Sequence, residues 1–128
     1  MKKLLFILIL FGVHSSAISQ SAPPADAYAY FTSGTPTPGF FKVTLPATQG
    51  IAAIKVRLGS AQGIYDLVDY VFVFDVTSGL PAGYSYARNN TELTLGIGSF
   101  EEPNTSFGEV LLQDASGNWS TPLQFISN

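Results

Sequence analysis

The chain has 128 residues, with six Lys or Arg, nine Asp or Glu, one His and no Cys, and a formal net charge of −3. An acidic chain with so few bases binds the phosphate backbone of nucleic acids poorly, so no nucleic-acid partner is expected. Without cysteine there are no disulfides, and the fold has to be held together by packing alone.

The N-terminus has the order of a secretory signal: two lysines, an apolar run over residues 4–13, and a tail of small and polar residues. The apolar run is shorter than the roughly 20 residues needed to span a bilayer, so a membrane anchor is not expected. Ala17 and Ser19 suit the −3 and −1 positions of a cleavage site. We therefore predict that residues 1–19 are a signal peptide cleaved between Ser19 and Gln20. The mature chain is then secreted, either extracellular or periplasmic, and is not inserted in a membrane.

Removal of residues 1–19 leaves four basic and nine acidic residues, a net charge of −5, on about 109 residues. That length suits one domain. The single histidine, His14, lies in the predicted signal, so the mature chain has neither His nor Cys. Ser-His-Asp and Cys-His catalysis and His- or Cys-ligated metal sites are thereby excluded. We expect no enzyme activity, no cofactor and no metal.

The first half of the mature chain begins with a Pro-rich leader, predicted over residues 20–38, in which residues 28–31 suit a short edge strand. Apolar residues then alternate with polar ones over 41–45 and 54–58, which predicts two half-buried strands. Residues 60–68 have helical spacing and leave a helical turn and a loop both open.

Residues 69–76 are apolar on both alternating sets of positions, which is typical of a central strand covered on both faces. After a Gly- and Pro-rich turn, further alternation predicts strands that begin at Tyr84, Leu93, Phe107 and Trp119, the last at a sheet edge because of Pro122. With about seven short strands and no convincing helix, residues 39–128 are predicted to form a single antiparallel β-sandwich of immunoglobulin-like or fibronectin type III-like type.

Three segments support a family resemblance: Ser78-Gly-Leu-Pro-Ala-Gly-Tyr-Ser-Tyr86, Leu93-Thr-Leu-Gly96 and Asp114-Ala-Ser-Gly-Asn118. Together they resemble bacterial extracellular immunoglobulin-like and cadherin-like domains. With Trp119-Ser-Thr-Pro122 added, the last hairpin is also similar to bacterial fibronectin type III-like modules. The resemblance covers residues 70–126 and implies a sandwich fold with an adhesion or spacer role. The Gly-Thr-Pro that usually follows the first segment and the acidic calcium motifs of cadherin repeats are absent, so the resemblance implies no metal site.

Aromatic residues suggest a second function, a stacking platform for sugar rings, to which asparagines add hydrogen bonds. Tyr28 and Tyr30 belong to this aromatic set. The residues predicted to bind the ligand are Trp119, Tyr84, Tyr86, Asn89 and Asn90. The alternative is that most of these rings belong to the core.

Carboxylates allow a third function. Two of them at a suitable separation can hydrolyse a glycosidic bond, and the candidates are Asp66, Asp69, Asp75, Glu101 and Glu102. Asp114 and Asn118 can either bind calcium or cap the turn between them.

The preferred hypothesis is a secreted, non-catalytic module that acts by surface contact with a protein or glycan partner at the cell surface, in adhesion or as a structural element. Carbohydrate binding is the alternative, and carboxylate-dependent glycan hydrolysis is the weakest of the three.

Overall fold

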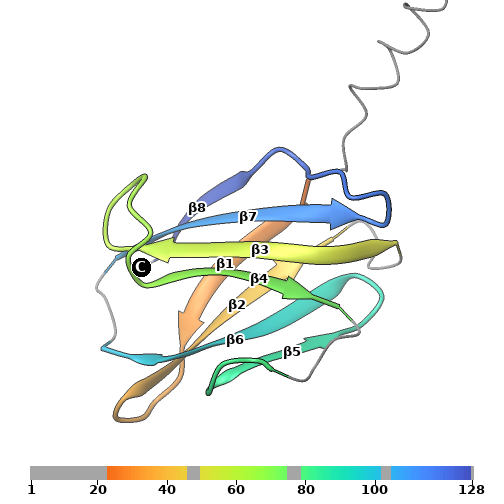
Figure 1. Cartoon of the computed structure of the whole chain (residues 1–128). Coiled ribbons are helices and arrows are strands. Elements are labelled where there is room, and N and C mark those ends of the chain that lie inside the picture. The colour runs from red at the N-terminus through yellow and green to blue at the C-terminus, as the bar shows by residue number, and fades with distance from the viewer. Residues whose placement is uncertain (1–22, 46–49, 75–78, 102–104, 128) are drawn as a thin grey trace, which may run out of the picture.

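The computed structural model describes residues 23–45, 50–74, 79–101 and 105–127, which form eight strands and no helix (Figure 1). All strand pairs are antiparallel and make two sheets of four strands. The predicted all-β class and the sandwich of two antiparallel sheets are therefore confirmed, with one strand more than expected. The predicted signal peptide and its cleavage point at Ser19 and Gln20 lie outside the described residues.

Each sheet takes its strands from both halves of the chain. Sheet I has, in spatial order, β1 (Asp26–Phe31), β2 (Thr37–Thr44), β6 (Glu92–Phe100) and β5 (Tyr84–Arg88). Sheet II has β4 (Val68–Val73), β3 (Ile51–Gly59), β7 (Ser106–Asp114) and β8 (Leu123–Ser127).

The core lies between the sheets and is filled by alternate residues of the strands, because successive side chains of a strand point to opposite faces. Its fully buried large side chains are Phe41, Val43, Leu93, Leu95 and Ile97 from sheet I and Ile54, Val56, Leu58, Phe72, Val110 and Leu112 from sheet II. The alternation read from residues 41–45, 54–58 and 93–97 is confirmed by this pattern.

Strand β1 lies inside the range predicted as a Pro-rich leader, residues 20–38, and confirms the short edge strand expected at residues 28–31. Its inward side chains, Ala27 and Ala29, are buried in the core, and the strand forms one edge of sheet I. The backbone N–H of Ala29 donates a hydrogen bond to Ser127 Oγ at 3.0 Å, which joins β1 to β8 of the other sheet. The sandwich therefore begins before residue 39.

The prediction of a central strand at residues 69–76 is wrong. Strand β4 is an edge strand of sheet II, beside β3 (Figure 1). Phe72 is fully buried, whereas Val71 and Val73 on the opposite face are exposed by 36% and 49%. The misreading arose because β-branched residues suit a pleated surface whether or not that surface is covered.

Residues 60–68 form a loop and the start of β4 rather than a helical turn. Ala61 and Ile64 pair in a short bridge, and the backbone carbonyl of Ile64 lies directly against Gly59. A side chain at position 59 would collide with that carbonyl, so the tight exit from β3 requires glycine. The last strand begins later than predicted, at Leu123, and does lie at a sheet edge.

The two faces of β4 predict different responses to truncation. Phe72→Ala removes a buried ring and should lower the free energy of unfolding by about 3–5 kcal/mol. Val71→Ala, on the outer face of the same strand, should cost less than about 1 kcal/mol. Urea unfolding of both variants measures the difference, and equal losses would contradict the assignment of Val71 to the outer face.

Candidate functional site

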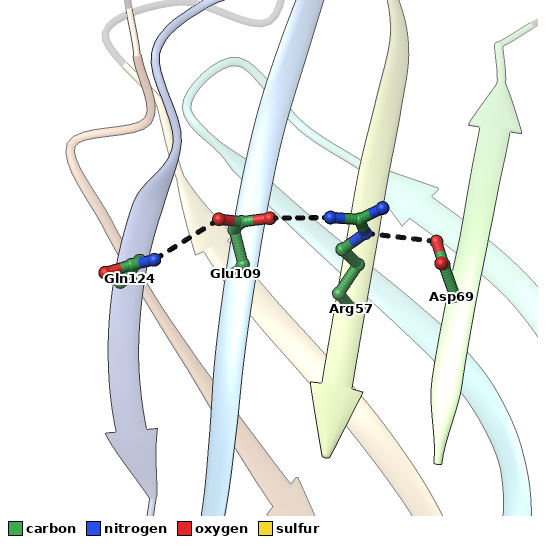
Figure 2. Close-up of polar contacts among 4 residues, drawn as sticks. All are labelled: Arg57, Asp69, Glu109 and Gln124. Atoms are coloured by element: carbon green, nitrogen blue, oxygen red, sulfur yellow. Dashed lines mark hydrogen bonds and ion pairs between the residues drawn. The ribbon is translucent and has the colours of Figure 1, made fainter. Parts of the chain in front are cut away.

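A row of four polar side chains crosses the outer face of sheet II. The strand register aligns Asp69 on β4 with Arg57 on β3, Arg57 with Glu109 on β7, and Glu109 with Gln124 on β8. Figure 2 shows the result, a continuous ladder of side-chain contacts over all four strands. Arg57 Nε donates to Asp69 Oδ1, Arg57 Nη1 donates to Glu109 Oε2, and Gln124 Nε2 donates to Glu109 Oε1, each at 3.3 Å.

Glu109 is the most buried member of this ladder, with only 8% of its surface exposed. A buried carboxylate is costly unless it is paired and hydrogen-bonded. Here Arg57 and Gln124 each satisfy one of its two oxygens. Burial alone would lower the pKa of Arg57, but hydrogen bonds and attraction from Asp69 and Glu109 outweigh it and raise that pKa. The guanidinium therefore stays charged and holds both carboxylates in place.

Tyr65, from the loop before β4, covers the middle of the ladder. The guanidinium carbon of Arg57 lies 5.1 Å from the centre of its ring, within the range of a cation–π contact. Burial, and then the negative charge of Glu109, raise the pKa of the Tyr65 hydroxyl. The ring thus covers part of the ladder at Arg57, whose side chain stays 30% exposed.

The loop that carries Tyr65 is fixed by its neighbour Asp66. One Asp66 carboxylate oxygen accepts the backbone N–H of Ser60 at 2.9 Å, and the other accepts the Ser60 hydroxyl at 2.8 Å. These hydrogen bonds lower the pKa of Asp66, with the backbone donor as the larger cause. The general acid of a glycosidase needs a raised pKa, so the environment of Asp66 favours a structural role.

Apolar side chains flank the ladder on both sides of the same face. Val71 and Val73 follow Asp69 along the outer side of β4. Ile126 follows Gln124 along β8, is exposed by 62%, and is paired with Phe107 on β7. We call the whole surface the sheet II face and define it by the four ladder residues with Tyr65, Val71, Val73, Phe107 and Ile126.

A small pocket of about 160 Å³ opens at the Ile126 end of this face. Tyr65, Phe107, Gln124 and Ile126 contribute to its walls, together with Gln62 of the loop. Pockets for drug-sized ligands run from about 300 to 1,000 Å³, so this one suits a single side chain or small group of a larger partner.

The predicted ligand-binding tyrosines face the core. Tyr84 lies 4.9 Å from Tyr70 and 5.9 Å from Phe72 between ring centroids, and Tyr86 lies 5.3 Å from Phe74. Burial, followed by repulsion from Tyr70, raises the pKa of Tyr84. These rings cover the edge of the core between the edge strands β4 and β5. This agrees with the alternative that most of the predicted aromatic residues belong to the core.

Among the other predicted ligand residues, Trp119 lies on a different sheet from the adjacent pair Asn89 and Asn90. Trp119 pairs with Gln113 of sheet II, whereas Asn89 and the exposed Asn90 follow β5 of sheet I. Asn89 Oδ1 accepts the backbone N–H groups of Thr91 and Glu92 at 3.0 and 2.9 Å, and so caps the turn. The structure does not bring the predicted set together on one surface, and its role in ligand binding stays a prediction.

The remaining oxygen ligands are engaged locally or lie outside the described residues. Asp114 Oδ1 accepts the backbone N–H groups of Ser116 and Asn118 at 2.9 and 3.0 Å, as a turn cap does. Asp75 and Glu102 fall outside the described ranges, and Glu101 is exposed. Within the described part of the chain, no three His, Cys, Asp or Glu side chains are grouped so as to hold a metal ion.

A scan against protein-family models and searches of curated proteins and of solved structures found no match to this chain. The arrangement of two antiparallel four-stranded sheets is compatible with an immunoglobulin-like or fibronectin type III-like sandwich. In the residues that the structure describes, no helix has the length and apolar character needed to cross a membrane.

Removal of the central cation of the ladder should destabilise the fold. Arg57→Leu leaves Glu109 buried without its charge partner, and we expect a loss of about 1–3 kcal/mol in the free energy of unfolding. Asp69→Asn changes the exposed end of the same ladder and should cost less than about 1 kcal/mol. Guanidinium unfolding at neutral pH compares the two variants, and a larger loss for Asp69→Asn would refute the central role of Glu109 and Arg57.

The hydrogen bonds from Ser60 to the Asp66 carboxylate predict a pH-dependent contribution to stability. Because its pKa is lowered on folding, the stabilisation is present above the pKa of the unfolded chain, about 4, and is lost as the pH falls through the folded value. Asp66→Asn should therefore unfold at a lower urea concentration than the parent at neutral pH, and the two midpoints should converge in acid. A constant difference between the midpoints at every pH would rule out a carboxylate contribution.

Proposed function

We propose that the chain is an exported, non-catalytic β-sandwich module of immunoglobulin-like or fibronectin type III-like type that acts by surface contact. The contact surface is the sheet II face, and the partner is a protein at the cell surface. The observation that carries the proposal is the exposure of Ile126, Val73 and Val71 around a charge ladder whose members are already paired.

The composition of the sheet II face suits a protein partner. Contact surfaces of proteins are enriched in Tyr and Arg, and these residues often supply most of the binding energy. Tyr65 and Arg57 lie in contact at the middle of this face, and apolar side chains lie on either side of them. Apolar side chains of the partner can cover Val71, Val73 and Ile126, while the pocket beside Ile126 receives one side chain.

The electrostatics of this face favour the same kind of contact. Arg57 neutralises one of the two ladder carboxylates, so the ladder keeps one net negative charge. Half-buried Lys55 borders the sheet II face, between Val71 and Leu111 in the strand register, and its positive charge brings the local total close to zero. A nearly neutral face does not repel a partner through its net charge, and its paired charges cost less to bury than unpaired charges would.

Binding to whole cells tests this function. Labelled protein should bind saturably to cells of the organism that produces it, and mild protease treatment of the cells should remove the binding. The double variant Val73→Lys and Ile126→Lys places two charges in the contact and should weaken binding about tenfold or more. Ser99→Lys, at an exposed position of sheet I, is the matched control and should bind like the parent.

Retention of parent affinity by the double variant, with its β-sheet circular dichroism unchanged, would show that the sheet II face is not the contact surface. Binding that resists protease would show that the partner is not a protein.

A further inference from the structure

The outer face of sheet I carries a group of rings that the core does not use, one exposed and two half-buried. Tyr28 and Tyr30 alternate along the outward side of β1, and Phe40 lies beside Tyr30 on β2. The ring centroids are 5.9 Å apart for Tyr28 and Tyr30, and 5.3 Å apart for Tyr30 and Phe40. We call these three residues the aromatic strip. Tyr28 is exposed by 43%, and no other aromatic side chain in the described ranges is as exposed.

Beside the aromatic strip, the side chains on the same face are short and polar or absent. Along one row of the sheet, Tyr30 and Phe40 are followed by Gly96 on β6 and Ser85 on β5. Gly96 has no side chain, and the Ser85 hydroxyl oxygen lies only 2.5 Å from the point where a Cβ of residue 96 would be. The rings therefore stand next to a shelf of bare backbone with a hydroxyl group above it.

The neighbouring row adds charged and hydroxyl groups in the same order. Tyr28 is followed by Lys42 and then by Thr94. Lys42 Nζ lies 3.1 Å from Glu92 Oε2, and both side chains remain partly exposed. The pair carries no net charge but offers both a hydrogen-bond donor and an acceptor at the border of the strip.

We propose that the aromatic strip and its polar shelf bind a neutral polysaccharide chain. A sugar ring has an apolar face of C–H groups and an edge of hydroxyl groups. Its C–H face can lie against the electron-rich faces of Tyr28, Tyr30 and Phe40. Its hydroxyls can then reach the polar groups of the shelf, which are Ser85, Thr94, Lys42 and Glu92.

The charges on this face select a neutral glycan over an anionic one. Lys42 is the base nearest to the strip, and Glu92 already neutralises it. A purely apolar partner would bury the Lys42–Glu92 pair and the hydroxyls of Thr94 and Ser85 without replacing their contacts with water, which is unfavourable. The strip belongs to the opposite sheet from the sheet II face, so this site is separate from the proposed protein contact.

Depletion assays with insoluble polysaccharides test the inference. Protein purified after expression of the full chain is mixed with microcrystalline cellulose, chitin, insoluble xylan and granular starch. Saturable loss of protein from solution onto at least one of them is the expected result. If the folded protein binds to none of the four, the inference fails, and the strip is left to a protein partner.

Matched variants locate the site. Tyr28→Ala and Tyr30→Ala should each weaken binding to the retained polysaccharide about tenfold or more, whereas Tyr28→Phe keeps the ring and should bind like the parent. The sheet II double variant, Val73→Lys with Ile126→Lys, should bind polysaccharide unchanged. That separates the two proposals, because each face has variants that leave the other intact.

As a control, circular dichroism and urea midpoints should show that the tyrosine variants are folded. Polysaccharide binding that is equal in the parent, Tyr28→Ala and Tyr30→Ala would overturn the assignment to the aromatic strip, even if the chain does bind glycans.

Discussion

The structure depends first on burial of one face of each sheet against the other. A chain without cysteine has only packing and hydrogen bonds to hold two four-stranded sheets together. Every second residue along each strand therefore has to be apolar, because those side chains point inward. Rings such as Phe41 and Phe72 fill the space between the sheets. This constraint also determines the outside, because every inward side chain leaves its two neighbours on an outer face. The two outer faces are the parts of the molecule that the core does not specify.

The chain uses its two outer faces differently. On sheet II, charged residues from β3, β4 and β7 lie in register and satisfy one another, with Tyr65 as a cover. On sheet I, aromatic residues gather toward the β1 edge, Lys42 and Glu92 pair on the central strands, and small residues occupy the opposite edge. The outer face of sheet II is therefore nearly neutral and is apolar at its borders. The outer face of sheet I changes from apolar to polar across its width. The two surfaces therefore suit partners of different chemistry, and the two proposals rest on this difference.

The strands could be predicted from the sequence where one face is polar, as for residues 41–45, 54–58 and 93–97. Prediction failed at β4, since Val71 and Val73 look the same in sequence whether they are covered or exposed.

The sequence contains the pattern Tyr-x-Tyr twice, at Tyr28 and at Tyr84. In β1 alanines take the inward positions and the tyrosines face out, whereas in β5 the tyrosines face in. Only the pairing of the strands distinguishes the two cases. The ladder was missed for the same reason, because Arg57 and Glu109 are far apart in sequence and meet only through the register of β3 with β7.

The close approach of the backbone after β3 has a consequence for the proposed contact through the sheet II face. Gly59 lets the backbone at Ile64 approach closely, and Asp66 ties the end of the loop back to Ser60. The backbone on either side of Tyr65 is thus tied down, and the Tyr65 ring rests against Arg57, without any partner. Association normally costs about 0.5–1.5 kcal/mol for each mobile side chain that it immobilises. In this loop that entropy has already been lost on folding, so the wall of the pocket is preorganised and more of the contact energy remains as affinity.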